Sequence, residues 1–494
     1  MRRPELAALL AGAAGVLCFA PFDLFWLAPL PWLALFALWR QAPNAHRAAL
    51  IGFLFGLGFF LAGVSWIYVS LSVFGGMLWW LAGPATLLFC TAMALYPTLA
   101  GWLFKRWQPA GFWRQALWFA VLIAAADWLR GWLFTGFPWL AIGYTQAPPS
   151  PLAGFAPLIG VYGLSLLLAL SAALLLRWRV GLPVLALLLA SGFGLRQLEW
   201  TEPVGEPVSV ALLQGNIPQD MKFEPDNFVR TLLRYRDMIA AHPARLTILP
   251  ETALPAFLDR LPPEYLDELT ALARQHGGDI VVGTLTGNPE TGYYNSAVSL
   301  GSAPQQTYSK QHLVPFGEFI PAGFAWFMAQ ANIPMSAFSA GPSRPAALSV
   351  AGQLVAFNIC YEDVFGEEII RTLPQAGMLA NLSNTAWFGR SLAQPQHLQI
   401  ARMRSAETGR PSLRATNTGM TAIIDARGDV VSALAPFETA VLTGEVRAYQ
   451  GSTPYIAWGN LGFLVLLLAG AGAAQIRRAA SAAGSPAPGA DARP

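Results

Sequence analysis

Long apolar stretches fill the first two hundred residues of the chain, and one more follows near its end. A helix needs about 20 apolar residues to cross the hydrocarbon core of a bilayer. The pattern predicts eight membrane spans, at residues 5–21, 23–39, 49–74, 77–104, 115–135, 157–176, 180–195 and 456–475. We therefore expect a polytopic helical membrane domain over 1–197, a final transmembrane helix over 456–478, and a disordered tail over 479–494.

Residues 198–455 have a different pattern, in which short apolar runs alternate with amphipathic stretches. The apolar runs predict strands at 208–213, 246–249, 280–283, 296–300, 354–359, 378–382, 421–424 and 430–433. The amphipathic stretches predict helices at 224–241, 262–276, 363–373 and 393–408. Strands that alternate with helices indicate a layered α/β domain, and this segment is long enough for one sizeable core.

Basic residues lie in every second loop between the predicted spans, from Arg2 and Arg3 at the start to Arg477 and Arg478 at the end. Because loops rich in Lys and Arg stay in the cytoplasm, both termini are expected there. Seven spans then carry residues 198–455 across the inner membrane, into the periplasm of a bacterium. The alternative is a cleaved signal peptide at 1–20, which Pro21 after the cut disfavours.

Composition agrees with a membrane protein, because 54% of the 494 residues are hydrophobic and 12% are charged. The charged share is about half that of an ordinary soluble domain. Between Glu202 and Arg447 the α/β segment has 17 basic and 23 acidic residues, a net charge of −6. An acidic domain lacks the basic surface of a nucleic-acid-binding protein, so no nucleic-acid partner is expected.

The α/β segment has one cysteine, Cys360, since Cys18 and Cys90 lie in predicted spans. A single thiol cannot form a disulfide within its own domain, so it is either buried or used in chemistry. Cys360 ends an apolar run and is followed by Tyr361, Glu362 and Asp363. Ligands bind at such strand ends in α/β folds, which favours a chemical role.

Glu251 and Lys310 also follow short apolar runs, and Lys310 is one of three lysines in an arginine-rich chain. A thiol needs a base to become a nucleophile at neutral pH, and a carboxylate can take its proton. An ammonium can stabilise the oxyanion of a tetrahedral intermediate. His312 and His397 offer a rival Cys–His arrangement, and sequence spacing alone leaves both possibilities open.

Several motifs around these residues are long enough to be specific. Residues 249–255, 308–318 and 358–362 resemble the nitrilase superfamily, which uses Glu, Lys and Cys in this order on an α-β-β-α sandwich. Residues 135–139, 214–219 and 381–389 are similar to its membrane-embedded branch, the apolipoprotein N-acyltransferase family. The resemblance extends over nearly the whole chain and includes the predicted spans.

The resemblance implies an acyl transfer in two steps. Cys360 would take a fatty acyl chain from the sn-1 ester of a phospholipid such as phosphatidylethanolamine. The α-amine of the diacylglyceryl-cysteine of an apolipoprotein would then accept it. Glu251 would be the general base and Lys310 the oxyanion stabiliser. The remaining implied site residues are Glu318, Tyr361 and Glu362 as active-site support, and Trp387 and Phe388 as a mobile flap.

One position departs from the family pattern, because Phe223 stands where the family often has Trp. The apolar stretch at 322–338 is expected to be either a membrane-facing lip or a core helix. Asp127 and Arg130, spaced i and i+3 in a predicted span, are either a structural ion pair or part of a wet cavity. We expect a monomer without cofactor or metal, since five scattered histidines offer no ligand spacing.

Two other functions stay open at this stage. A membrane-tethered amidase of the nitrilase type could use the same three residues on a small carbon–nitrogen substrate. A simple anchor needs one span, however, and the seven upstream spans favour a lipidic substrate. A transporter or scaffold without chemistry is the third possibility, and the presence of all three residue types disfavours it.

Overall fold

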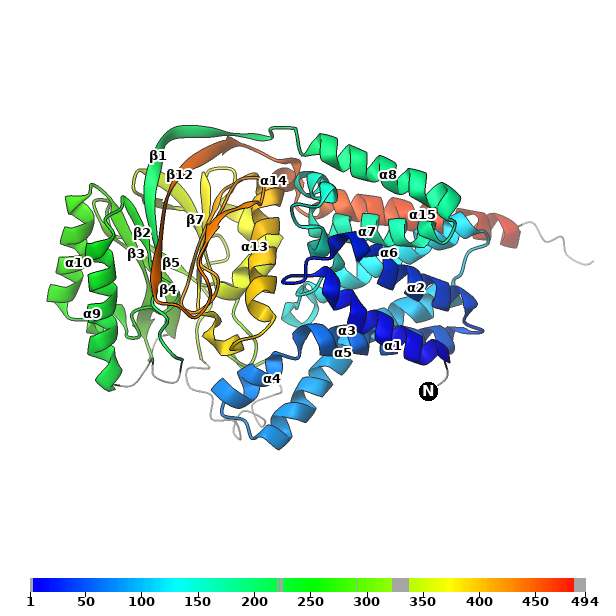
Figure 1. Cartoon of the computed structure of the whole chain (residues 1–494), viewed down its shortest axis with the longest axis horizontal. Coiled ribbons are helices and arrows are strands. Elements are labelled where there is room, and N and C mark those ends of the chain that lie inside the picture. The colour runs from blue at the N-terminus through cyan, green and yellow to red at the C-terminus, as the bar shows by residue number, and fades with distance from the viewer. Residues whose placement is uncertain (1–2, 220–221, 223–224, 291, 322–336, 484–494) are drawn as a thin grey trace, which may run out of the picture.

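The structure is a computed structural model that describes residues 3–219, 222, 225–290, 292–321 and 337–483. Phe223, residues 322–336 of the expected lip, and residues 484–494 of the expected tail lie outside this description. Figure 1 shows two units side by side. The helical unit combines the N-terminal part of the chain with the last helix, and the α/β unit is formed by the residues between them.

A helix occurs in each predicted span, although the boundaries differ. The helices are α1 Arg3–Gly15, α2 Pro29–Gln41, α3 Ala45–Val64, α5 Trp79–Arg106, α6 Phe112–Arg130, α7 Ala156–Leu175, α8 Trp178–Leu195 and α15 Leu461–Ala483. Within the described residues, four stretches are long and apolar enough to cross a membrane, namely 45–64, 79–106, 151–175 and 178–195. Helices α1 and α2 have 13 residues each, and α6 contains three charged side chains. The count of eight spans therefore stays a prediction.

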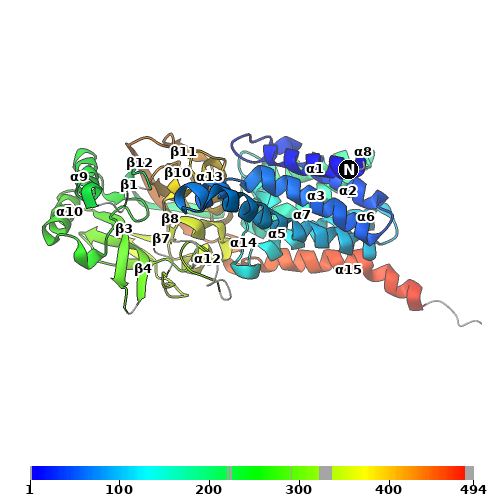
Figure 2. The same ribbon diagram turned by 90° about the horizontal axis from the view of Figure 1, so that it is seen from below.

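Two predicted spans are interrupted. The span at 49–74 ends as a straight helix at Val64 and continues through α4 (Ile67–Val69) and a π-helical turn at Ser70–Phe74. This continuation leads from the bundle towards the α/β unit (Figure 1). Near the C-terminus, Gly459, with φ +56°, separates α14 (Pro454–Trp458) from α15. Helix α15 runs alongside the bundle and continues past the expected start of the tail (Figure 2).

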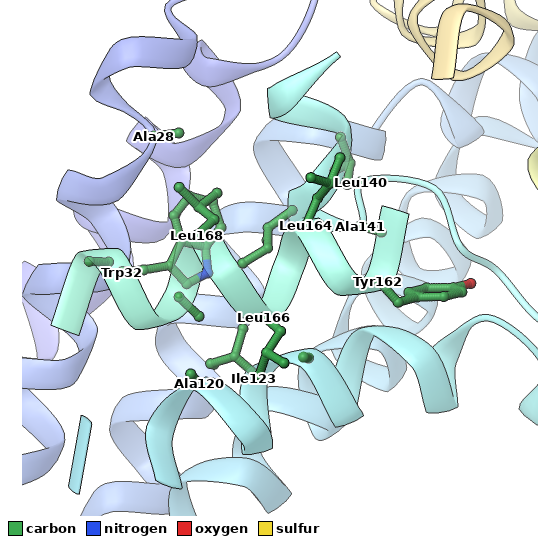
Figure 3. Close-up of a cluster of buried hydrophobic side chains, with 14 of the residues drawn as sticks. Ala28, Trp32, Ala120, Ile123, Leu140, Ala141, Tyr162, Leu164, Leu166 and Leu168 are labelled. Carbon is green, nitrogen blue, oxygen red and sulfur yellow. The ribbon is translucent and has the colours of Figure 1, made fainter. Parts of the chain in front are cut away.

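The helices pack closely because glycine replaces larger side chains where backbones meet. A Cβ atom on Gly12 of α1 would lie 1.9 Å from the carbonyl oxygen of Phe55, and one on Gly52 of α3 would lie 2.2 Å from that of Pro97. Small residues allow such contacts between helices in a bilayer. Larger apolar side chains fill the space between α2, α6 and α7 (Figure 3).

Two six-stranded sheets form the α/β unit. The first has the order β12-β1-β2-β3-β4-β5, with β1 Thr201–Gln214, β2 Leu246–Ile248, β3 Asp279–Asn288, β4 Gly292–Gly301, β5 Thr307–Ser309 and β12 Ala440–Gly451. The second has the order β11-β10-β9-β8-β7-β6, with β6 Leu348–Val350, β7 Gln353–Ile359, β8 Met378–Ser383, β9 Ser412–Thr416, β10 Ala422–Ile424 and β11 Val430–Ala433.

Alternation of side chains along β1 shows how the layers stack. Val210 and Leu212 enter the apolar core between the sheets, whereas Ala211 and Leu213 pack under α9 (Pro225–Ala241) and α10 (Pro263–Gln275). Helix α13 (Ala393–Thr408) lies on the second sheet, between it and the helical unit (Figure 1). The α/β unit is therefore a helix–sheet–sheet–helix sandwich, as the resemblance to the nitrilase superfamily implies.

The predicted continuous helix at 363–373 is wrong. This stretch consists of a 3₁₀ turn at Cys360–Val364, the single-turn helix α12 (Gly366–Ile369) and a second 3₁₀ turn at Ile370–Thr372. Glu362, inside the first turn, accepts hydrogen bonds from Tyr308 and Gln311, in the segment around the end of β5. These tertiary contacts hold the turn in place and override the helical pattern. Strands β5, β6, β9 and β12 were not predicted, because β5 and β6 have three residues each and polar residues interrupt the apolar pattern of β9 and β12.

Candidate active site

Glu251, Lys310 and Cys360 come together although Cys360 follows a strand of the second sheet and the other two residues follow strands of the first. Glu251 lies beyond the end of β2, Lys310 follows β5, and Cys360 follows β7. Lys310 Nζ lies 3.5 Å from Glu251 Oε1, and the charges of Glu251 and Lys310 both act on the Cys360 thiol. All three side chains are buried. The face-to-face packing of the sheets thus brings together the acid, the ammonium and the thiol.

Two amides fix the orientation of the Glu251 carboxylate. Asn295 Nδ2 donates to Oε1 at 2.7 Å, and the main-chain N–H of Asn384 donates to Oε2 at 2.8 Å. Hydrogen bonds to an ionised carboxylate are stronger than those between neutral groups. Glu251 is therefore held as an oriented acceptor next to the thiol.

Lys310 is held by a second carboxylate. Its Nζ lies 2.8 Å from Glu318 Oε1, and Glu318 Oε2 accepts a hydrogen bond from the Val314 main chain at 2.8 Å. Burial acts to lower the pKa of Lys310, but the carboxylates of Glu318 and Glu251 outweigh it and raise this pKa. The lysine is therefore a fixed, permanently charged ammonium.

Cys360 stands at a sharp change of chain direction. Its φ of +54° is uncommon for a residue with a side chain, and such conformations cluster at functional sites. Burial and the Glu251 carboxylate raise the pKa of the thiol, and the Lys310 ammonium opposes them. The resting thiol is therefore protonated and needs a base before it can attack.

Glu362 connects the segment after Lys310 to the strand before Cys360. Its Oε2 accepts from the Ile359 main chain at 2.6 Å and from the Tyr308 hydroxyl at 2.7 Å. Its Oε1 accepts from the main chain of Gln311 at 2.6 Å. Burial raises the pKa of Glu362, while these hydrogen bonds oppose the shift. Glu362 thus joins the segment that contains Lys310 to the turn that contains Cys360.

Tyr361 points away from the three residues and into the helical unit. Its hydroxyl donates to the Gly136 carbonyl at 3.0 Å, and its ring belongs to the apolar core of the helices. Trp387 and Phe388 also contact the helical unit. Ser70 Oγ donates to the Trp387 carbonyl at 2.9 Å, and the Phe388 ring centre lies 4.7 Å from that of Trp66. The strand end with Cys360 therefore adjoins the helices.

The two histidines are engaged elsewhere. His397 Nε2 lies 2.7 Å from Asp363, and its Nδ1 lies 2.6 Å from an Arg414 nitrogen that can only donate. Burial and Arg414 lower the pKa of His397, which is therefore neutral. The His312 ring stacks on Phe365 at 3.6 Å. A carboxylate, and not an imidazole, faces the thiol.

Asp127 and Arg130 form a structural ion pair at 3.0 Å. Arg130 also donates to the carbonyls of Phe137 and Trp139, at 2.5 Å each, and Asp127 Oδ2 accepts from the Ile142 main chain at 2.8 Å. Their charges are thus used to fix the loop after α6. Within the described residues, no cluster of three His, Cys, Asp or Glu side chains could hold a metal ion.

Sequence reasoning missed three neighbours of Glu251. Asn295 lies in the middle of β4, and the main-chain donor of Asn384 gives no sequence signal at all. Lys222 Nζ donates to the main-chain carbonyl of Glu251 at 3.1 Å. The scarcity of lysine was a signal for Lys222, as it was for Lys310.

The chain is similar to two protein families over separate regions. A family model described as the apolipoprotein N-acyltransferase N-terminal domain matches residues 11–174, and one described as carbon-nitrogen hydrolase matches residues 209–455. Among solved structures, a carbon-nitrogen hydrolase from Helicobacter pylori is 16% identical, with 48% of this chain and 88% of that chain covered and a TM-score of 0.37. An amidase from Nesterenkonia sp. is 17% identical, with 53% and 97% covered and a TM-score of 0.39.

Full-length relatives are much more similar. The apolipoprotein N-acyltransferase of Nitrosomonas europaea is 50% identical over 488 residues, which cover 95% of this chain and 97% of that protein. The apolipoprotein N-acyltransferase of Chromobacterium violaceum is 47% identical, with 92% of this chain and 90% of that protein covered. The chain, with a carbon-nitrogen hydrolase domain set against membrane-type helices, belongs to the apolipoprotein N-acyltransferase family.

Proposed function

We propose that this protein transfers a fatty acyl chain from a phospholipid to the α-amine of the diacylglyceryl-cysteine of an apolipoprotein, through a thioester on Cys360. One observation favours this function for the present chain. Tyr361, the residue after Cys360, donates a hydrogen bond from its hydroxyl to the Gly136 carbonyl of the helical unit. The nucleophile thus adjoins the part of the chain that enters the bilayer, where both lipidic substrates reside. A small soluble amide would need no such contact.

In the first half-reaction, Glu251 takes the thiol proton while the Cys360 sulfur attacks the ester carbonyl of the phospholipid. The tetrahedral oxyanion forms near the Lys310 ammonium, which stabilises it. The C–O bond then breaks, and Glu251 returns the proton to the departing glycerol oxygen. The products are a lysophospholipid and the acyl thioester.

In the second half-reaction, the amine of the lipoprotein attacks the thioester carbonyl and Glu251 takes its proton. The C–S bond breaks, and the proton passes to the departing sulfur, which restores the thiol. Exclusion of water is required, because hydrolysis of the thioester would compete with the amine. Glu318 supports Lys310, Glu362 positions the catalytic segments, and Trp387 and Phe388 border the site on the helical side.

The proposed setting is the inner membrane of a bacterium. The unit formed by residues 198–455 would lie in the periplasm, and both termini would lie in the cytoplasm. The basic loops between the apolar stretches support this orientation. The protein would act as a monomer, with the helices of residues 1–197 and the last helix anchoring the catalytic unit.

Purified protein, phosphatidylethanolamine with a labelled sn-1 chain and a diacylglyceryl-cysteine peptide test the proposal. We expect the label to appear on the peptide as an amide, in amounts that match the lysophospholipid released. Free labelled fatty acid without labelled peptide would contradict the transferase assignment and indicate a hydrolase.

A further inference from the structure

Lys222 is a buried lysine beside the candidate active site. Lys222 is 3% exposed, and its Nζ donates to the main-chain carbonyl of Glu251 at 3.1 Å. In the described part of the chain, no carboxylate lies within 4.0 Å of this ammonium, although an ammonium has three donors. Among the described residues its hydrogen-bond partner is a neutral carbonyl, and burial of an ammonium beside a neutral group is costly.

Charge balance in the site offers an explanation for this buried ammonium. Two carboxylates, Glu251 and Glu318, lie within 4.0 Å of one ammonium, Lys310. These three groups carry a net charge of −1. Transfer of the thiol proton to Glu251 leaves that total unchanged and moves negative charge onto sulfur and then onto the substrate oxygen. A second cation beside these groups would bring their total charge to zero.

We propose that Lys222 supplies this second positive charge and positions Glu251 through its main-chain carbonyl. The electrostatic neighbours of Lys222 support the assignment, because it interacts with both Glu251 and Cys360. Lys222 thus favours the thiolate that forms when Glu251 takes the proton. The inference rests on the proposed function in one respect, namely that Cys360 is the nucleophile.

The pKa of Lys222 predicts how its effect on the Cys360 thiolate depends on pH. Burial lowers this pKa to about 8, while the negative charges of Glu251 and Cys360 oppose the shift. The ammonium is therefore charged at neutral pH and loses its charge as the pH rises past 8. The stabilisation of the thiolate by Lys222 must decrease over the same pH range. Lys310 remains charged in that range because its pKa is raised.

Alkylation of Cys360 by iodoacetamide in the full-length protein tests the proposed effect of Lys222 on the thiolate and needs no acyl substrate. The rate at Cys360, followed by peptide mass spectrometry, reports the thiolate fraction. At pH 7 we expect Lys222→Met to slow alkylation about ten-fold, the effect of a thiol pKa raised by one unit on loss of a nearby cation. Lys105→Met, in the helical unit, is the matched control and should react like the wild type.

Above pH 9 the wild type and Lys222→Met should converge, because the wild-type lysine is then neutral. Equal rates at pH 7 would overturn the proposal. A ten-fold difference in alkylation rate that persists unchanged above pH 9 would also overturn the proposal. It would indicate that Lys222→Met alters the structure of the site and not only its charge. Failure of acyl transfer in the wild type would contradict the proposed function separately, since alkylation needs neither donor nor acceptor.

Discussion

At the scale of single residues, the two carboxylates of the candidate site, Glu251 and Glu318, have different surroundings. Glu318 lies 2.8 Å from Lys310 and accepts a hydrogen bond from the Val314 main chain. Glu251 lies farther from Lys310, at 3.5 Å, and of the charged groups near the Cys360 thiol it is the one that acts on it most strongly. This difference supports the proposed base role of Glu251 and the proposed support role of Glu318.

Replacement of Glu251 by Gln tests that assignment. The amide keeps the size of the side chain but cannot accept the thiol proton, so we expect thioester formation to slow at least about 100-fold, the lower range for a lost general base. Single-turnover acylation by phosphatidylethanolamine measures it. Glu445→Gln, an exposed carboxylate on β12, is the control. A Glu251→Gln rate near the wild type would remove Glu251 from the mechanism.

Asn295 offers a second test, because its amide donates to both carboxylates, at 2.7 Å to Glu251 and 3.2 Å to Glu318. Asn295→Asp would place a third negative charge beside Lys310. Like charges favour protonation, so acylation should fall strongly at pH 7.5 and recover in part towards pH 6. A pH profile of the single-turnover rate measures this. A loss that is equal at every pH would point to misfolding instead.

The sequence allowed Glu251, Lys310 and Cys360 to be predicted, because each follows an apolar strand and lies in a recognisable motif. It did not allow Asn295 or Asn384 to be predicted. The contact of Asn384 uses its main-chain N–H, which every residue except proline possesses. The outward direction of Tyr361 also depends on packing against Gly136, 225 residues away in the chain.

At the scale of elements, a buried polar network links α13 and β9 to the turn that follows Cys360. Arg414 of β9 donates to Asp363 at 2.7 Å, and His397 of α13 bonds to the same carboxylate. Arg414 also donates to Asn381, whose side chain donates to the Cys360 carbonyl at 3.2 Å. Such networks are costly when one member loses its partner.

This network predicts a loss of stability in mild acid. The pKa of His397 is lowered in the folded protein, so the unfolded chain binds a proton more readily. Stability is therefore retained above the ordinary histidine pKa of about 6.5 and decreases as the pH falls below it. Thermal unfolding between pH 7.5 and 5.5 measures the effect. His397→Gln should flatten the profile, and an unchanged slope would contradict the assignment.

Helix α13 was predicted with its observed boundaries, since its pattern is continuous over residues 393–408. The stretch after Cys360 was not, because its conformation is set by Glu362 and its partners in the segment around the end of β5. Local patterns thus specify elements that tertiary contacts leave regular. They do not specify a segment whose conformation depends on a buried side chain bonded to residues far away in the sequence.

At the scale of the whole molecule, polar contacts join the two units. Glu407 of α13 accepts a hydrogen bond from the Val161 main chain at 2.8 Å, next to the kink that Gly160, with φ +63°, introduces into α7. Gln396 of α13 accepts from the Trp139 ring nitrogen at 2.8 Å. The catalytic unit is thereby held to the helices at several places, and its orientation towards the membrane follows from theirs.

The orientation itself is testable in cells. A reporter active only in the cytoplasm, such as a fluorescent protein, should be functional when fused after residue 483. Alkaline phosphatase, active only in the periplasm, should be functional when inserted at the turn between β3 and β4. The opposite pair of results would reverse the proposed topology.

The most direct test of the whole account is the intact mass of the purified protein after incubation with phosphatidylethanolamine, compared between the wild type and Cys360→Ala. We predict one fatty-acyl adduct on the wild type that hydroxylamine removes, and none on the folded variant. An adduct that persists in Cys360→Ala, or a wild type without any adduct, would contradict a thioester on Cys360.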